Sequence, residues 1–231
     1  GGLMSLLGDA GHTEMVDCLK SITSLLRKPS AIVVVSAHWE EKLPTITAGE
    51  SPSLIYDYYG FPEESYRITY PCKGAALLAN KIREKLERAG IACNLDKQRG
   101  FDHGLFIPLK IMYPDAAEHI SIGQALQGLD YENLLLIGSG FSFHNMKAFF
   151  TPETTESKDL NEAFESWLLD TCSNTNISEE ERKQRLCEWV KAPGARFCHP
   201  REEHLLPLYV CYEIGRASCR EKCRSRWSPY H

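Results

Sequence analysis

Two histidines stand just beyond runs of apolar residues, in positions where a parallel sheet would bring them to one edge. His38 follows the run AIVVV at 31–35, and His144 follows LLLI at 134–137 after a glycine-rich stretch. In open α/β sheets, ligands bind beyond the carboxyl ends of the strands. Imidazole binds metals and exchanges protons near neutral pH. The pair therefore predicts a metal or proton-transfer site, although a lone histidine is more often a hydrogen-bonded structural residue.

A third candidate is His103, which lies between Asp102 and Gly104 and precedes an apolar run. Two interpretations stay open from the residues alone. Asp102 could orient the imidazole ring, as a carboxylate behind a metal-ligating or catalytic histidine does. Alternatively, Asp102 starts a helix that His103 helps to cap.

A fourth candidate is His204, within the segment FCHPREEHLLPLYV at 197–210. Pro200 favours a helix start, which would place Glu202, Glu203 and His204 in the first helical turn. The two acids are then most simply surface groups that complement the helix dipole. The other four histidines have less context and are expected to be structural or exposed: His12, His119, His199 and His231.

The candidate histidines suggest a metal without identifying it. Two or three imidazoles, with or without a carboxylate, suit Fe(II) or Zn(II). An iron site with open positions activates dioxygen, whereas zinc polarises water or a carbonyl. The sequence has no H-E-x-x-H, Walker loop, G-x-S-x-G or dinucleotide fingerprint that would choose another chemistry.

These candidates need a framework, and the pattern of the chain predicts an α/β fold. Two short apolar runs, 31–38 and 133–140, read as strands covered on both faces. Apolar residues at helical spacing predict helices between and after them, with Gly90 as a C-cap and Ser178 and Glu181 as a capping box. Alternating strands and helices predict a single domain with a central, largely parallel sheet flanked by helices. The predicted helices are 13–29, 74–90, 158–173 and 178–193.

The segment 49–71 breaks the α/β pattern with six aromatic residues and three prolines. We call it the aromatic loop. A long loop inside a compact domain is usually functional or disordered, and this aromatic content argues against disorder. The loop either packs on the surface of the sheet or forms a lid or wall for a flat substrate. Its aromatic residues are Tyr56, Tyr58, Tyr59, Phe61, Tyr66 and Tyr70.

Composition bounds the class of protein. The 231 residues carry a net charge of −5, which gives no reason to expect nucleic-acid binding. No apolar run reaches the roughly 18 residues of a membrane helix, and no signal peptide is visible at the start. The nine cysteines are odd in number and include no C-x-x-C pair. We therefore expect reduced thiols and a cytoplasmic protein.

Several motifs, taken in order, resemble one family. They are SAHWE, YDYYGFP, GFDHG, MYPDA, GSGFSFHN and HPREEHLLPL, spread from residue 36 to residue 208. Together they resemble the class III extradiol ring-cleavage dioxygenases, in particular the 4,5-DOPA dioxygenase-like branch. The likeness runs from about residue 1 to about residue 210, and the family's single α/β domain agrees with the pattern above.

The resemblance implies a site, a cofactor and a reaction. A non-heme Fe(II) or Zn(II) would be held by residues matching His38 and His204, with His144 as a further ligand or as the catalytic acid/base. His103 would lie near the substrate, and the aromatic loop would flank its ring through Tyr56, Tyr58 and Phe61. The implied substrates are a DOPA-like catechol and dioxygen, which inserts beside the diol and opens the ring to a semialdehyde.

The sequence departs from the family pattern in three places. The family places another metal-ligating histidine about two residues before Gly1, and we expect a chain without it to bind metal weakly and to be less active. The segment 112–126 looks shortened, which suggests a deletion near 116–117. The segment 213–231 is basic, rich in Ser and Cys, and unlike the family. The catalytic domain is therefore expected to span 1–212, followed by a disordered tail.

Two other functions remain open at this point: a zinc-dependent hydrolase on the same scaffold, and a non-catalytic degenerate homologue. The expected partners are a small-molecule catechol and dioxygen, without nucleic acid or membrane. The sequence does not indicate the oligomeric state.

Overall fold

The computed structural model describes residues 3–8, 10–114 and 133–215 of the chain. The chain divides into two compact units, Gly1–Ser139 and Gly140–His231. We call them the first and second unit and describe each by itself.

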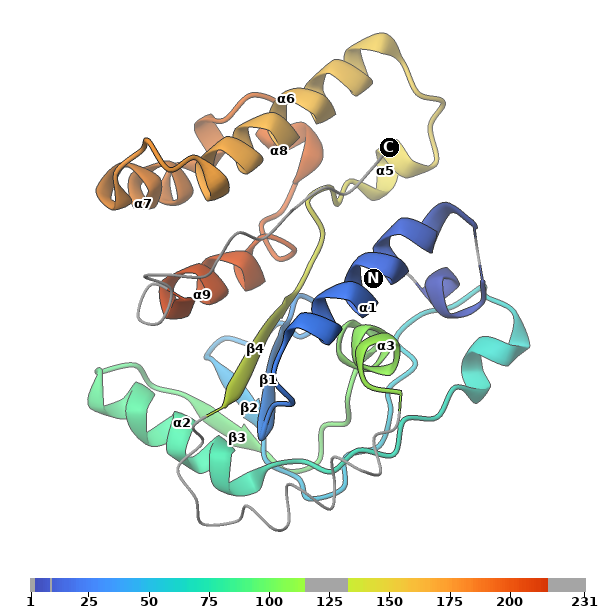
Figure 1. Cartoon of the computed structure of the whole chain (residues 1–231), viewed down its shortest axis with the longest axis vertical. Helices are drawn as coiled ribbons and strands as arrows, with labels where there is room; N and C mark the ends of the chain where they lie inside the picture. The colour runs from blue at the N-terminus through green and yellow to red at the C-terminus, as the bar shows by residue number, and fades with distance from the viewer. Residues whose placement is uncertain (1–2, 9, 115–132, 216–231) are drawn as a thin grey trace. The chain divides into compact units, whose positions relative to one another are not determined.

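The first unit contains the predicted parallel strands (Figure 1). Strand β1, Ala31–Ser36, pairs in parallel with β4, Leu134–Ser139, in a register that runs from Ala31 opposite Leu134 to Ser36 opposite Ser139. A second parallel pair joins β2, Thr45–Thr47, to β3, Asn94–Asp96. The predicted α/β class with parallel strands is confirmed, and the described strands form two pairs of two.

Helix α3, His103–Met112, forms the centre of the first unit's core. Phe106 and Ile107 on this helix are fully buried, and β1 contributes Ile32 and Val34 to the same cluster. β-Branched residues suit a strand because their stiff side chains pack well on a pleated surface. The core therefore fixes the start of α3 against the carboxyl end of β1.

Other helices of the first unit match the predictions to within a few residues. Helix α1 spans Thr13–Leu25 and α2 spans Ala76–Arg88. Gly90 follows α2 at φ +77°, the left-handed conformation that glycine adopts at little cost. The described part of this unit also contains three short 3₁₀ helices: η1 Leu3–Leu6, η2 Ala10–His12 and η3 Glu63–Arg67.

The second unit is helical in its described part. Its longest helix, α6, spans Thr155–Ser173 and packs through the buried Phe164 against Cys198 and Leu205. Ser178 caps α7 by accepting a hydrogen bond from the backbone of Glu181, which is one half of the predicted capping box. The remaining elements are α5 Met146–Phe149, α7 Glu179–Cys187, η4 Trp189–Lys191, α8 Ala195–Cys198 and α9 Leu206–Gly215.

Two helix predictions in this unit were wrong in extent. The predicted helix 178–193 ends at Cys187 and continues only as the 3₁₀ turn η4. The helix predicted to start at Pro200 begins at Leu206 instead. There the carbonyl of Glu202 accepts hydrogen bonds from the backbone N–H groups of Leu205 and Leu206, which forms a turn before the helix.

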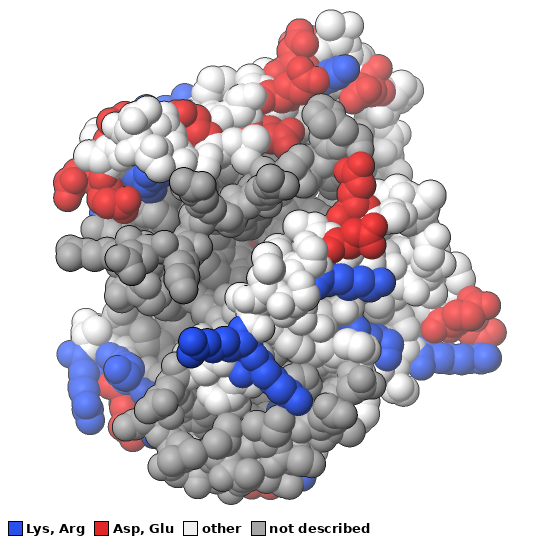
Figure 2. Space-filling model, in the orientation of Figure 1, with Lys and Arg blue, Asp and Glu red and all other residues white. Residues whose placement is uncertain are grey.

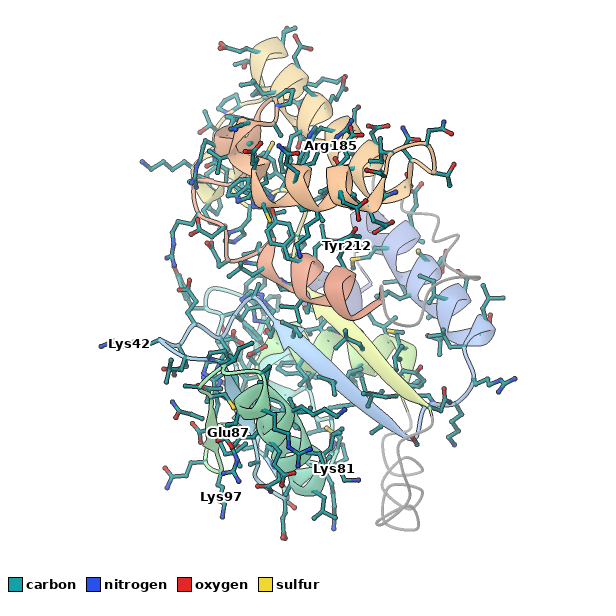
Figure 3. The ribbon with its side chains drawn as sticks, turned by 90° about the vertical axis from the view of Figure 1, so that its left-hand side faces the viewer. Lys42, Lys81, Glu87, Lys97, Arg185 and Tyr212 are labelled. Atoms are coloured by element: carbon teal, nitrogen blue, oxygen red, sulfur yellow. The ribbon has the colours of Figure 1, made fainter. Side chains whose placement is uncertain are left out.

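The face shown in Figure 2 carries charged side chains of both signs, with acids gathered over α6 and α7. Lys81 and Glu87 lie on α2, and Arg185 on α7 pairs with Asp170 and Glu181 (Figure 3). Among the described residues, no helix combines the length and apolar character needed to cross a bilayer.

The cysteines that the structure describes are free thiols, which agrees with the reduced state expected from the sequence. Burial raises the pKa of the Cys72 thiol to about 11. The suggested deletion near 116–117 lies outside the described residues, as do His119 and His231. Helix α9 includes the first three residues of the atypical segment 213–231, and the rest of that segment also lies outside.

Candidate functional site

The first unit brings together His38, Asp57 and His103, which we call the first cluster. His38 follows β1 by two residues. The ladder between β1 and β4 extends one residue beyond the strand through Ala37, whose N–H donates to the carbonyl of Ser139 at 3.0 Å. His103 is the first residue of α3. The two rings lie side by side with centroids 4.0 Å apart.

Asp57 connects the aromatic loop to both histidines. Its Oδ1 accepts hydrogen bonds from the backbone N–H of His103 at 3.0 Å and from His103 Nδ1 at 2.8 Å. Its Oδ2 lies 3.9 Å from Nδ1 of His38. Sequence reasoning did not select Asp57, because the residue stands in a loop 46 positions before its partner.

Asp102, which the sequence suggested as the partner of His103, has a different role. It is the residue before α3, and its side chain accepts a hydrogen bond from Ser36 Oγ at 2.8 Å. It also pairs with Arg99 at 3.4 Å. Asp102 does start the helix as its N-cap residue, but its side chain makes no capping hydrogen bond and His103 is already the first helical residue. The carboxylate that holds the His103 ring is Asp57.

The electrostatics of the first cluster favour a neutral His38. Burial, with help from nearby His103, lowers the pKa of His38 to about 4, although Asp57 and Asp102 oppose the shift. Burial alone would raise the pKa of Asp57, but the hydrogen bonds from His103 outweigh it and keep that pKa below its ordinary value. At neutral pH, His38 thus has an unprotonated nitrogen, which metal coordination requires.

The aromatic loop lies against this cluster. The ring of Tyr58 meets His103 edge-on with centroids 5.6 Å apart, and Phe61 lies 5.7 Å from Tyr58. Tyr56 packs against Tyr58 and Phe106 instead. Of the three predicted substrate residues, Tyr58 therefore lies nearest to the candidate histidines.

Gly104 allows the close approach of α3 to His38. A Cβ at this position would lie 2.6 Å from Cδ2 of His38 and 2.6 Å from Oγ of Ser36. Contacts this short do not occur for real Cβ atoms, so any larger residue would displace one of these groups. Glycine is therefore needed at this position because no side chain fits between α3 and the candidate ligand His38.

The second unit brings together His144, Glu203 and His204, which we call the second cluster. The two imidazoles stack with centroids 3.6 Å apart and planes at 26°. Nδ1 of His144 lies 3.2 Å from Oε1 of Glu203, and the backbone N–H of His144 donates to the carbonyl of Cys198. His204 is buried, and Phe141 lies 5.5 Å from its ring.

Glu203 corrects a second expectation. The sequence suggested a surface acid in a helical first turn, but α9 begins later and the Glu203 side chain is only 14% exposed. Glu202 does behave as a surface acid and pairs with Arg196. His199 is structural, as expected: it is fully buried, and its Nε2 donates to the carbonyl of Ser142 at 2.7 Å.

Both clusters have a donor set that fits a divalent transition metal. Each contains two imidazoles and one carboxylate, with one ligand atom per residue lying within 4.8 Å of the others. Two histidines and a carboxylate that leave coordination positions open are typical of non-heme Fe(II) oxygenases, and Zn(II) accepts the same ligands.

Comparison with known proteins identifies the family. The family model for the catalytic LigB subunit of aromatic ring-opening dioxygenase matches residues 9–230. The dioxygenase tasH of Hapsidospora irregularis is 33% identical, with the match covering 97% of this chain and 78% of the relative. The 4,5-DOPA dioxygenase extradiol of Beta vulgaris is 35% identical over 87% of this chain and 79% of its own.

A relative from Escherichia coli with the same description is 31% identical over 93% of this chain and 82% of its own. The fold also matches a crystal structure of an uncharacterized protein from E. coli K12. That match has a TM-score of 0.57 at 29% identity and covers 84% of this chain and 78% of the other. The chain therefore belongs to the LigB family of aromatic ring-opening dioxygenases, and it is an oxidoreductase of the extradiol class.

Proposed function

We propose that this dioxygenase opens the aromatic ring of a DOPA-like catechol beside its two hydroxyl groups, with Fe(II) as the working metal. The relatives described as 4,5-DOPA dioxygenases suggest the substrate class. The observation that carries the metal proposal is the donor set of the two clusters, each with two imidazoles and a carboxylate.

The proposed metal ligands are His38, His204 and His144, as the family resemblance implies. The structure supports each choice separately: His38 is held neutral by burial, and His144 and His204 stack with a carboxylate alongside. Bound Fe(II) would supply the means to bring catechol and dioxygen together. Zn(II) fits the same ligands but has no redox chemistry.

The chain's own residues would manage the protons of the catechol. Ring opening requires that the hydroxyl groups lose protons, and histidine is suited to accept one near neutral pH. His103 is a proposed catalytic residue, since Asp57 lies beside its Nδ1 and leaves Nε2 as the nitrogen for proton exchange. His144 is the other: Glu203 lies beside its Nδ1, so its Nε2 serves either as a metal ligand or as the catalytic acid/base, as the family resemblance implies. Tyr56, Tyr58 and Phe61 are proposed to flank the substrate ring, with Tyr58 nearest to His103.

The proposal is tested by measuring oxygen uptake and visible absorbance. The purified chain is loaded anaerobically with Fe(II) and offered L-DOPA and simpler catechols, with resorcinol as a control that lacks adjacent hydroxyl groups. We expect one dioxygen consumed per catechol and a yellow semialdehyde product, because both oxygen atoms enter the product. Metal-loaded protein that consumes no oxygen with any catechol, but hydrolyses an ester or amide, would contradict the proposal.

The ligand assignment has its own test. His38→Ala and His204→Ala are each expected to lower bound iron severely, because an open metal site has few ligands to lose. His12→Ala changes a histidine outside both clusters and should keep its iron. His144→Ala should abolish ring cleavage while the fold is retained, as judged by circular dichroism; unchanged turnover would remove His144 from the catalytic group.

A further inference from the structure

We propose that Asp57 is a positioning residue for His103: its carboxylate holds the ring so that Nδ1 carries the hydrogen and Nε2 exchanges the proton of the substrate. This inference deepens the proposed function, on which it rests, because it takes His103 as a residue near the catechol. Neither the sequence motifs nor the family resemblance assigned a role to Asp57.

The geometry at Asp57 determines which tautomer His103 adopts. One oxygen, Oδ1, accepts from both the backbone N–H and the ring Nδ1 of His103, at 3.0 and 2.8 Å. An ionised carboxylate can only accept hydrogen bonds, so Nδ1 must be the protonated nitrogen. In the neutral ring, Nε2 is then the unprotonated nitrogen and the only one able to take a proton.

Asp57 is itself held in place from both sides along the aromatic loop. The hydroxyl of Tyr56 donates to the carbonyl of Ile68, and the hydroxyl of Tyr58 donates to the carbonyl of Ser65, both at 2.7 Å. Burial raises the pKa of Tyr58 to about 12, so its phenol stays protonated and able to donate. These bonds tie the side chains on either side of Asp57 to the far part of the loop, which restrains Asp57 next to the His103 ring.

No other described carboxylate makes this contact with His103. Asp102, its neighbour in sequence, is occupied by Ser36 and Arg99. The side chains of His103 and Asp57 are 15% and 23% exposed, and Asp57 as a whole residue lies at the surface. A charged hydrogen bond of this length is stronger than a neutral one and resists rotation of the ring.

The experiment reads the tautomer and the kinetics separately. Nitrogen NMR of isotope-labelled histidine in the Zn(II)-loaded full chain reports which ring nitrogen carries the hydrogen, and His103→Asn assigns the signal. We expect the wild type to show Nδ1–H at His103, Asp57→Asn to keep it, and Asp57→Ala to give a mixture. Asparagine can still accept both hydrogen bonds, whereas alanine accepts none.

The Fe(II)-loaded enzyme gives the second readout. Asp57→Ala should lower kcat for catechol by about 10- to 100-fold, the usual loss when the carboxylate behind a functional histidine is removed, with KM little changed. Asp57→Asn should recover most of that loss. Asp96→Ala is the matched control, because Asp96 at the end of β3 also accepts two hydrogen bonds on one oxygen, both from backbone N–H groups of Gln98 and Arg99, and it should leave kcat unchanged.

The possible outcomes distinguish a failure of the positioning role of Asp57 from a failure of the proposed function. A His103 signal that is the same in wild type and Asp57→Ala would overturn the positioning role. Loss of bound iron in Asp57→Ala in proportion to the lost activity would overturn it too, since the effect would then pass through the nearby His38. A wild type that shows the Nδ1–H tautomer but cleaves no catechol would overturn the proposed function instead.

Discussion

Glu203 is the second carboxylate that holds a candidate catalytic ring, and it gives a test at the level of a single side chain. Its Oε1 lies 3.2 Å from Nδ1 of His144, where a carboxylate accepts a stronger hydrogen bond than a neutral amide does. Glu203→Gln keeps the shape and removes the charge. We expect kcat to fall about 10-fold, measured by oxygen uptake.

The neighbouring acid provides the control for this variant. Glu202→Gln removes an equal charge one residue away, but Glu202 pairs with Arg196 at the surface and should leave kcat unchanged. Equal losses of kcat in the two variants would mean that only net charge matters here, which would contradict a specific role for Glu203.

Tyr58 tests the proposed role of the aromatic loop. Its ring lies next to His103, and Phe61 packs edge-on against it. Tyr58→Ala should raise KM for catechols about 10-fold, since an aromatic contact of this kind is worth roughly 1 kcal/mol and the variant also removes apolar area. Tyr59→Ala is the control, because the Tyr59 side chain is 91% exposed. An unchanged KM in Tyr58→Ala would exclude Tyr58 from the substrate pocket.

The sequence indicated the histidines of both clusters but not their carboxylates. His38 and His144 were visible because each follows an apolar strand-like run. His103 and His204 were visible because each precedes an apolar run and has acidic neighbours. Asp57 was missed because its partner is 46 positions away, and no local pattern links a loop to a distant helix start. Glu203 was misjudged because Pro200 suggested a helix that does not begin there.

At the scale of the elements, the close approach of a helix to a neighbouring segment positions the candidate residues. Gly104, in the first turn of α3, is the clearest case, because it lies directly next to His38. Alanine normally stabilises a helix relative to glycine by up to about 1 kcal/mol. At this position, however, its Cβ would meet His38 and Ser36 at 2.6 Å. We expect Gly104→Ala to displace His38 and weaken Fe(II) binding at least about 10-fold, measured by metal titration, because ligand geometry tolerates displacements of only about 0.5 Å.

Gly140 offers a contrasting substitution in the second unit. A Cβ there would lie 2.2 Å from the backbone carbonyl oxygen of His204, which cannot rotate away as a side chain can. Gly140→Ala should therefore destabilise the fold more than Gly104→Ala, as measured by urea denaturation. A Gly104→Ala protein that binds Fe(II) like the wild type would show that His38 does not depend on this approach.

Element boundaries were harder to predict than element types. The apolar runs located β1 and β4, because a short run of consecutive aliphatic residues is typical of a strand that is covered on both faces. The helical spacing in 178–193 continued past the true end of α7, where Glu188 leaves the helical conformation with φ −100° and ψ 22°. For α9, Pro207 in the first helical turn marks the start, in agreement with the preference of proline for that place.

At the scale of the whole molecule, buried histidine makes stability depend on pH. Burial, with a smaller contribution from His144, lowers the pKa of His199 below its ordinary value of 6.5. The hydrogen bond to the Ser142 carbonyl and the charge of Glu203 act to raise this pKa but do not outweigh burial. The unfolded chain therefore binds this proton more readily than the folded one. The stabilising contribution is complete above pH 6.5 and is lost as the pH falls from 6.5 towards the lower pKa of the folded state.

His199→Gln isolates this effect, because glutamine can still donate to the Ser142 carbonyl but does not titrate. Between pH 6.5 and 5, the free energy of unfolding of the wild type should fall more steeply, by up to about 1.4 kcal/mol per pH unit. The measurement is urea denaturation at several pH values. His12→Gln, a histidine outside this core, should keep the wild-type slope; equal slopes in His199→Gln and wild type would refute the prediction.

Metal removal connects the site to the stability of the whole chain. A ligand that binds only the folded state stabilises it by RT ln(1 + [L]/Kd), which is about 2.7 kcal/mol at one hundred times Kd. We expect chelation to lower Tm, and both Fe(II) and Zn(II) to restore it, because imidazole accepts either ion. Only Fe(II) should restore oxygen uptake, since zinc has no redox chemistry.

Mg(II) is the control: it prefers oxygen ligands and should restore neither property. Recovery of Tm with Mg(II) alone would mean that carboxylates, rather than the histidines, hold the stabilising ion.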